Sequence, residues 1–315
     1  MKYFIITIDT EGDNLWEWHD GDLITTQNTM YLQRFQNICN KYGFKPVWLT
    51  NYEMISDERY VKFITDVEAT NAGELGMHLH AWNTPPEYNL PVECDGAPYL
   101  IEYPVEIMEE KIRFLTNEIE NRTGIRPTTH RAGRWAMNNE YFMLLTKYGY
   151  TVDCSFTPHI NWASSVGRTK NSRGSDYTKC SETPFYKTYG EKKILEVPVS
   201  TEISHRYHIP EKINLRKIVG NTIRAYHGSP VWIRPNGKNI DQMIRFSDET
   251  LTKNKDYLMF MLHSSEMMPG GSPTFKTKES IEILYKDLER LFLHISKNYE
   301  GITLRDYRKK YGAGN

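Results

Sequence analysis

The sequence predicts a single α/β domain of the barrel type. Short apolar segments rich in β-branched residues alternate with amphipathic helical patterns, as in folds built from repeated strand–helix units. About seven such units follow one another, which suits one barrel. A chain of 315 residues is a normal length for such a domain. No change of composition marks a linker, so we expect one domain over residues 1–315, with loop insertions at one end of the strands.

The first half of the chain holds the clearest strand–helix units. Residues 3–8 form a short apolar run of the kind that is buried on both faces of a parallel sheet. The clearest helix opens at Pro104, carries apolar residues at steps of three and four, and ends at Gly124. Further helices are expected over 26–42, 57–70 and 139–148, and further strands over 46–50, 73–77, 128–131 and 151–153.

The second half continues the alternation after a polar interruption. Residues 157–190 are rich in Ser, Thr, Gly and charge, which indicates an insertion or a set of loops over the site. Strands are expected over 194–199, 231–234 and 257–262, followed by a long terminal helix over 278–299.

Composition excludes several classes of partner. The 39 basic and 40 acidic residues nearly cancel, so no basic field points to nucleic acid or to an anionic membrane. The four cysteines are scattered without metal-binding or disulfide spacing, as in a reducing compartment. No apolar run is long enough to span a membrane, and the N-terminal run is too short for a signal peptide. We expect a cytoplasmic protein, and the sequence leaves its oligomeric state open.

Chemically useful side chains follow several of the predicted strands. In parallel α/β folds, reactive groups gather where strands end at their C-terminal edge. The residues found there could bind a metal or move a proton; they lie in Asp9-Thr10-Glu11-Gly12-Asp13, His78-Leu79-His80, His130-Arg131, Asp153 and His263.

The acids and the histidines each occur at a spacing of two. Asp9 and Glu11 share a face of an extended segment, where they repel each other unless a cation lies between them. His78 and His80 share a face in the same way, and histidine with carboxylate is a common ligand set for zinc and similar ions. The pattern predicts a divalent-metal site, whereas turn formation explains Asp13.

The remaining polar residues each allow two interpretations. His263 is either a general acid or a hydrogen-bonded histidine at a strand end. Arg131 either pairs with Asp9 and keeps it ionised or lies on the surface. His205 and His208 flank Arg206 in a polar loop, where they are solvated or line the rim of the substrate site.

The order of these motifs resembles the polysaccharide deacetylases, the NodB-homology group of carbohydrate esterases. The resemblance covers most of the chain and implies a distorted (β/α)7 barrel. The five motifs of that family are similar, in order, to Thr7-Ile8-Asp9-Thr10-Glu11-Gly12, Glu74-Leu75-Gly76-Met77-His78-Leu79-His80, Arg131-Ala132-Gly133-Arg134-Trp135, Asp153-Cys154-Ser155-Phe156 and Leu262-His263, and Gly43-Phe44-Lys45-Pro46-Val47-Trp48 is similar to the second strand and its approach.

The resemblance implies a metal-dependent deacetylase. Glu11, His78 and His80 would hold a divalent ion, with zinc the first expectation, and Asp9 aligned by Arg131 would act as the base. The implied substrate is an N- or O-acetylated amino sugar or a precursor of a surface polysaccharide.

Further residues receive roles from the same resemblance. His263, paired with Asp153, would protonate the leaving amine. Trp82, Arg134 and Trp135 would contact the carbohydrate.

Two positions depart from the family pattern. Glu11 stands one residue later than the usual second aspartate, and Trp82 occupies the place of the usual second histidine, so that His80 offers itself instead. Two alternatives therefore stand beside the deacetylase: a hydrolase of cyclic amides on the same fold, and a non-catalytic barrel that binds a glycan or a partner protein.

Overall fold

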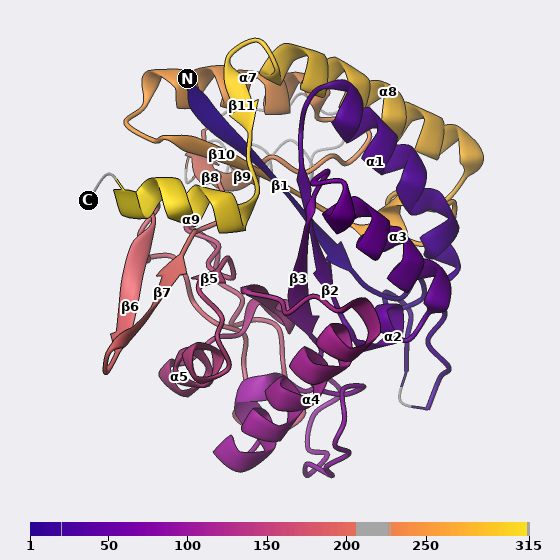
Figure 1. Cartoon of the computed structure of the whole chain (residues 1–315), viewed down its shortest axis with the longest axis vertical. Helices are drawn as coiled ribbons and strands as arrows, with labels where there is room; N and C mark the ends of the chain where they lie inside the picture. Colours follow the sequence, from indigo (N-terminus) through magenta and orange to yellow (C-terminus); the bar gives the residue numbers. More distant parts are fainter. Residues whose placement is uncertain (20, 206–225, 227, 314–315) are drawn as a thin grey trace.

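The computed structural model describes residues 1–19, 21–205, 226 and 228–313. They form one α/β domain in which most helices surround a curled sheet (Figure 1). Within the described residues this sheet has nine strands in the order β10-β1-β2-β3-β4-β5-β7-β6, with β11 paired to the start of β1. Arg206 and His208, which the sequence placed in a polar loop, lie outside the described residues.

Seven consecutive strands of this order run parallel, which agrees with the expected seven-stranded, distorted barrel. Their bounds are β1 Lys2–Thr10, β2 Pro46–Thr50, β3 Glu74–Leu79, β4 Thr129–Ala132, β5 Val152–Asp153, β7 Lys192–Glu196 and β10 Tyr257–His263. The other strands are β6 Phe185–Tyr189, which is antiparallel to β7, the separate pair β8 Thr201–Ser204 and β9 Ser229–Trp232, and β11 Tyr299–Gly301.

The helices follow the expected alternation. Their bounds are α1 Leu32–Lys41, α2 Tyr52–Ile55, α3 Glu58–Ala69, α4 Val105–Thr123, α5 Asn139–Lys147, α7 Ile240–Thr252, α8 Lys278–Ile295 and α9 Leu304–Ala313. Short 3₁₀ turns are η1 Gln27–Tyr31, η2 Leu100–Glu102, η3 Gly133–Trp135 and η4 Ser264–Met267. As predicted, Gly124 terminates α4. Its φ of 73° lies in the left-handed region, which glycine adopts readily because it has no Cβ.

Several boundaries differ from the prediction. The expected strand over 231–234 overlaps β9, which pairs with β8, and Ile233 just beyond β9 forms a parallel bridge with Phe260 of β10. The terminal helix ends at Ile295 and not at Tyr299, because Tyr299 begins β11 and pairs with Lys2. The prediction did not include α7 and α9. Apolar residues at steps of three in α7, Ile240, Met243 and Phe246, are a signal that could have found it.

The strands are buried on both faces, as the apolar run of residues 3–8 predicts. Phe4, Ile6 and Ile8 belong to the core between sheet and helices, whereas Ile5 belongs to a second core on the inner face. Alternate residues of one strand thus serve two cores.

The curl of the sheet brings distant strands together. Strands β1 and β4 are separated by β2 and β3, so in a flat sheet they would lie about 14 Å apart. Yet Asp9 of β1 and Arg131 of β4 form an ion pair of 2.6 Å on the inner face. The site therefore depends on closure of the sheet and not on adjacent strands alone.

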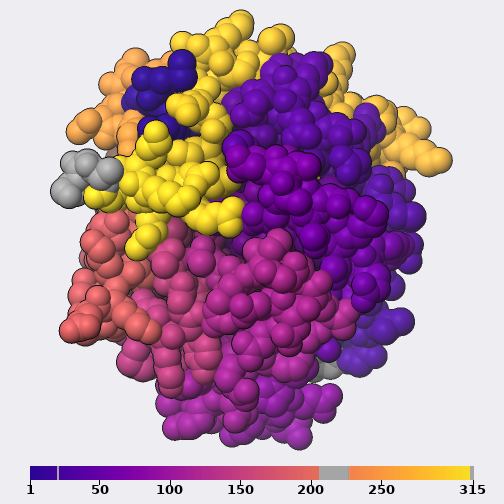
Figure 2. Space-filling model, in the orientation of Figure 1, coloured from indigo at the N-terminus to yellow at the C-terminus, as the bar shows by residue number. Residues whose placement is uncertain are grey.

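The two ends of the described chain meet on one side of the molecule. Figure 2 shows the first residues of the chain lying against the C-terminal segment, which agrees with the pairing of β11 with β1. In the described part of the chain, no helix is long and apolar enough to cross a membrane.

Candidate active site

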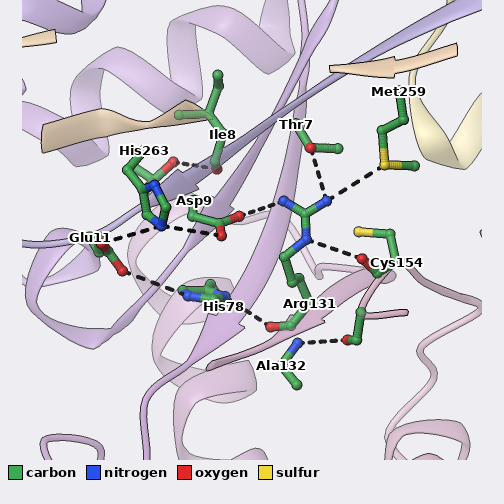
Figure 3. A network of polar contacts seen from close by, with 12 residues as sticks. Thr7, Ile8, Asp9, Glu11, His78, Arg131, Ala132, Cys154, Met259 and His263 are labelled. Atoms are coloured by element: carbon green, nitrogen blue, oxygen red, sulfur yellow. Dashed lines mark hydrogen bonds and ion pairs between the residues drawn. The ribbon is translucent and has the colours of Figure 1, made fainter. Parts of the chain in front are cut away.

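The ends of β1, β3, β4 and β10 place four chemically useful side chains around one point. In the parallel registers, Asp9 lies opposite His263 and His78 lies opposite Arg131. Figure 3 shows Asp9 between Arg131 and His263, with Glu11 and His78 on the neighbouring side. This confirms the expectation that these side chains lie together.

Arg131 fixes Asp9 in its ionised form. The guanidinium is fully buried and donates to Asp9 Oδ1 at 2.6 Å, to Thr7 Oγ1 at 2.9 Å and to the Cys154 carbonyl at 3.1 Å. Burial alone would raise the pKa of Asp9, but the charge and hydrogen bond of Arg131, together with His78 and His263, outweigh it and hold that pKa below its usual range. The interpretation of Arg131 as the partner of Asp9 is thus confirmed.

Glu11 lies against both histidines of the pair. Its Oε2 is 3.8 Å from His78 Nε2 and 3.4 Å from His80 Nε2. Ligand atoms of all three residues lie within 4.8 Å of one another, and all three side chains are buried. Asn28 Nδ2 fixes the Glu11 backbone by donating to its carbonyl oxygen at 2.7 Å.

The protonation states favour a cation among these three groups. Burial lowers the pKa of His78 to about 4 and that of His80 well below its ordinary value, so both rings are neutral near pH 7. Burial and the neighbouring carboxylate of Asp9 raise the pKa of Glu11 well above its ordinary value. A positive charge beside the carboxylates would relieve this repulsion.

The donor set fits a divalent ion. His78 Nδ1 lies 3.0 Å from the Arg131 carbonyl, an acceptor that keeps the proton on Nδ1 and leaves the Nε2 lone pair facing Glu11. His80 also presents Nε2 to Glu11, while its Nδ1 is buried without a hydrogen-bond partner. Two imidazoles and one carboxylate form a familiar zinc site with room for further ligands.

His263 approaches the same centre from β10. Its Nε2 lies 3.8 Å from Asp9 Oδ2 and 3.9 Å from Glu11 Oε1. On the other side of the ring, Nδ1 lies 3.1 Å from Glu266 Oε2 and 3.0 Å from Arg234 Nη2. Glu266 and Arg234 were not predicted as site residues. The position of Glu266 three residues after His263, in the turn η4, could have indicated its contact with that ring.

The predicted pairing of His263 with Asp153 is wrong. Asp153 instead lies 2.6 Å from His130 Nδ1 and accepts hydrogen bonds from the Ser155 amide and hydroxyl. Both Asp153 and His130 are completely buried, and β1, β2, β3 and β4 lie between β5 and β10 in the order of the sheet. The carboxylate that lies against His263 Nδ1 is instead that of Glu266, three residues later in η4.

A cavity of about 320 Å³ opens onto these groups. Trp82 lies on one wall, where it stacks on His80 at 4.3 Å between ring centroids. Trp135 lies on another wall and stacks on Trp162 at 6.3 Å. Four of the seven tryptophans of the chain line the cavity, and two of them, Trp16 and Trp18, were not singled out in the sequence.

Arg134 lines the cavity but its charged group is engaged elsewhere. It donates to the carbonyls of Ala97 and Val166 and lies 4.1 Å from the centre of the Tyr99 ring. Its φ of 54° and that of Trp135, 63°, are both in the left-handed region that non-glycine residues seldom adopt.

Two other expected residues lie apart from the cavity lining. Asp13 accepts hydrogen bonds from Thr25 Oγ1 and from the Asn28 amide, which confirms its role in the turn. His205 is exposed at the end of β8 and is not part of this cavity wall.

Comparison with known proteins identifies the fold. The sequence matches no family profile and no curated protein. Among solved structures, the chain is similar to a putative polysaccharide deacetylase from Mycobacterium smegmatis, with a TM-score of 0.56 and 14% identity over 99% of this chain and 91% of that one. The fold is that of the polysaccharide deacetylases. The resemblance and the fold class expected from the sequence motifs are confirmed at this level.

The same fold also carries other carbohydrate-active enzymes. The chain is similar to a 4-alpha-glucanotransferase from Thermococcus litoralis, with a TM-score of 0.55 and 13% identity, although it spans only 40% of that protein. It is similar as well to a branching enzyme from Thermococcus kodakaraensis, with a TM-score of 0.55 and 10% identity over 98% of this chain and 71% of that one. Fold alone therefore does not choose the reaction, and the side chains of the site must do so.

Proposed function

We propose that this protein is a metal-dependent hydrolase that removes an acetyl group from an amino sugar or from a larger carbohydrate. The observation that carries the proposal is the grouping of Glu11, His78 and His80, which face a cavity beside the Asp9–Arg131 pair. The proposed ion is zinc, because two imidazoles and one carboxylate suit it.

The proposed mechanism divides the work among three groups. A divalent ion held by Glu11, His78 and His80 would polarise the acyl carbonyl and acidify a water molecule. Asp9 accepts the proton of the attacking water, and Arg131 keeps its carboxylate oriented and ionised in the meantime. His263 lies near Asp9 Oδ2, whereas Arg131 binds Oδ1. His263 donates a proton to the leaving amine, while Glu266 holds the ring through Nδ1.

The walls of the cavity support a carbohydrate substrate. Trp82 and Trp135 line the cavity, and aromatic rings in a cavity wall can pack against the C–H faces of sugar rings. Trp82 stacks on His80 and Trp135 stacks on Trp162, and these contacts hold the two rings in position.

A reaction at a glycosidic bond is the competing function, because two structural neighbours transfer glucan chains. Such enzymes use two carboxyl groups that flank the bond, one protonated and one ionised. The raised pKa of Glu11 and the lowered pKa of Asp9 fit that division of roles. The two neutral histidines facing Glu11 favour a metal site instead, because cleavage of a glycosidic bond by two carboxyl groups does not require them.

The deciding experiment combines metal analysis with acetate release. We expect the purified protein to take up about one zinc ion per chain and to release acetate from N-acetylated amino sugars only when loaded. An α-glucan and a cyclic amide serve as the alternative substrates, and turnover of either in place of acetate release would refute the deacetylase. A protein that takes up no divalent ion at micromolar concentration would refute the metal-dependent hydrolase.

The variant Asp9→Asn separates the base from the ligands. We expect it to keep its zinc, because Asp9 is not one of the three grouped ligands, and to lose activity by about 10²–10⁴-fold, because the base is gone. Zinc content by mass spectrometry and acetate release by a coupled assay give the two readouts. If Asp9→Asn loses zinc along with activity, Asp9 is a ligand and the assigned roles are wrong.

A further inference from the structure

The two histidines of the proposed metal site differ in what orients their rings. His78 Nδ1 lies 3.0 Å from the backbone carbonyl of Arg131, and this contact leaves Nε2 to face Glu11 (Figure 3). His80 is buried to the same degree, but its Nδ1 has no protein hydrogen-bond partner in the described part of the chain. A histidine that binds a metal ordinarily donates its other N–H to an acceptor that fixes the ring. The orientation of His80 therefore depends on another kind of contact.

Trp82 supplies a contact of that kind. Its ring stacks on the His80 ring, with 4.3 Å between ring centroids and 23° between ring planes. Stacked aromatic rings attract each other beyond the area that they bury, and a tilt of the imidazole would separate or collide the two faces. Gly133 bounds the same imidazole, since a Cβ at that position would stand 2.5 Å from His80 Cδ2. Packing thus holds His80 Nε2 at 3.4 Å from Glu11 Oε2.

The segment that carries Trp82 is anchored to α4. The Thr84 amide donates to the His80 carbonyl at 3.3 Å, which closes a turn around Trp82. Lys111 of α4 donates from Nζ to the carbonyls of Thr84 and Pro86 at 2.5 and 2.6 Å, and this lysine is 1% exposed. A buried ammonium group is costly to leave without acceptors, so the turn cannot move away from Lys111 freely.

A second anchor joins this segment to the loop of the carboxylate ligand. Glu53 of α2 accepts a hydrogen bond from Asn83 Nδ2, and its Oε1 accepts one of 2.9 Å from the Gly12 amide. Gly12 directly follows Glu11, and Asn83 directly follows Trp82. The same carboxylate therefore ties the Trp82 segment to the strand end that carries Glu11.

We propose that Trp82 is a positioning residue of the metal centre, whose stacked ring holds His80 with Nε2 toward the ion. The stack takes the place of the hydrogen bond that orients His78. This inference rests on the proposed metal-dependent function and adds to the role of Trp82 in the cavity wall. Loss of the flat ring at this position should weaken metal binding even when no carbohydrate is present. A tryptophan that serves only as a wall for the substrate would leave the metal affinity unchanged.

The zinc affinity of matched tryptophan variants tests the proposal. Trp82 and Trp135 line the same cavity, but Trp82 stacks on a proposed ligand whereas Trp135 stacks on Trp162. We expect Trp82→Leu to raise the zinc dissociation constant by about 10–100-fold, as for other groups that orient metal ligands, and Trp135→Leu to change it by less than about threefold. Competition with a chromophoric chelator measures the constant without carbohydrate. Unchanged zinc affinity in folded Trp82→Leu, or an equal loss in Trp135→Leu, would overturn the proposal.

A conservative variant separates positioning from a general loss of structure. Trp82→Phe keeps a flat ring, so we expect its zinc affinity to stay within about threefold of that of the unsubstituted protein. The visible spectrum of bound cobalt reports the coordination geometry, and it should be preserved in Trp82→Phe and altered in Trp82→Leu. Urea denaturation of the metal-free proteins checks that the three have folded. A preserved cobalt spectrum in Trp82→Leu would contradict the positioning role.

The unsubstituted protein offers a test that does not depend on the folding of a variant. In its zinc-loaded state, we expect nuclear Overhauser contacts between the ring protons of His80 and the indole of Trp82. Their absence would show that the rings separate when the ion is bound, and the proposal would fall.

Zinc uptake and acetate release distinguish failure of this inference from failure of the proposed function. If the unsubstituted protein takes up no divalent ion, both fall. If it releases acetate and Trp82→Leu binds zinc as tightly, the reaction stands and the positioning role falls. If Trp82→Leu loses zinc affinity as expected while the zinc-loaded unsubstituted protein releases no acetate, the positioning role stands and the proposed reaction falls.

Discussion

Two buried groups of histidine and carboxylate lie at the ends of neighbouring strands, and they differ in what surrounds them. Glu11 and His78 face a cavity, and the Nε2 atom of the histidine lies 3.8 Å from the nearer carboxylate oxygen. Asp153 and His130 are sealed in the core at 2.6 Å, and Tyr141 occupies the other ring nitrogen at 2.8 Å.

The difference teaches how to separate a metal site from a structural contact. In the sealed pair, both ring nitrogens and both oxygens of Asp153 already have protein partners. In the open pair, the backbone carbonyl of Arg131 accepts a hydrogen bond from His78 Nδ1, and Nε2 stays available. An available lone pair beside a second carboxylate and a cavity, more than residue type, marks the reactive cluster.

Removal of His78 should have the largest effect on metal binding. We expect His78→Ala to reduce bound zinc from about one ion per chain to nearly none, since it deletes one of three ligands. Mass spectrometry of the native protein measures the zinc, and circular dichroism checks that the fold is retained. Full zinc occupancy in a folded His78→Ala protein would show that the open cluster is not the metal site.

Removal of Asp153 should change stability and not metal binding. Asp153→Ala leaves His130 Nδ1 and the Ser155 amide without their buried acceptor, so we expect the free energy of unfolding to fall by about 3–5 kcal/mol. Urea denaturation measures the loss, and zinc uptake below the transition should equal that of the unsubstituted protein. A large loss of zinc affinity with little loss of stability would reverse the roles assigned to the two clusters.

Acid should act on the open cluster through His78. The pKa of His78 is about 4 in the folded protein against 6.5 ordinarily, so between these values the unfolded chain binds the proton first. Acidification from pH 6.5 to pH 4 therefore favours unfolding, and the contribution of this group returns as the pH rises. We expect the metal-free protein to lose stability relative to His78→Ala over this interval, in urea denaturation at a series of pH values. Parallel stability profiles for the two proteins would contradict the shift.

The local elements were largely predictable from sequence. The strand at Pro46–Thr50 was predicted with its observed bounds, and the helix ending at Gly124 was predicted by its apolar spacing and its terminal glycine. The pairing of Asp9 with Arg131 was one of two interpretations that the sequence left open. The strand and the helix depend on local backbone preferences and on the spacing of apolar residues, and a short segment of sequence is enough to show both.

The sequence by itself determined the strand–helix alternation, the chemical types at the strand ends and the turn role of Asp13. Only the tertiary structure decided which of those groups face one another. Closure of the sheet brought Arg131 to Asp9 across two intervening strands, and the turn after β10 gave His263 to Glu266 and left Asp153 to His130. The physical reason is that local sequence sets the direction of each side chain along its strand, whereas the curl of the sheet sets the distances between strands.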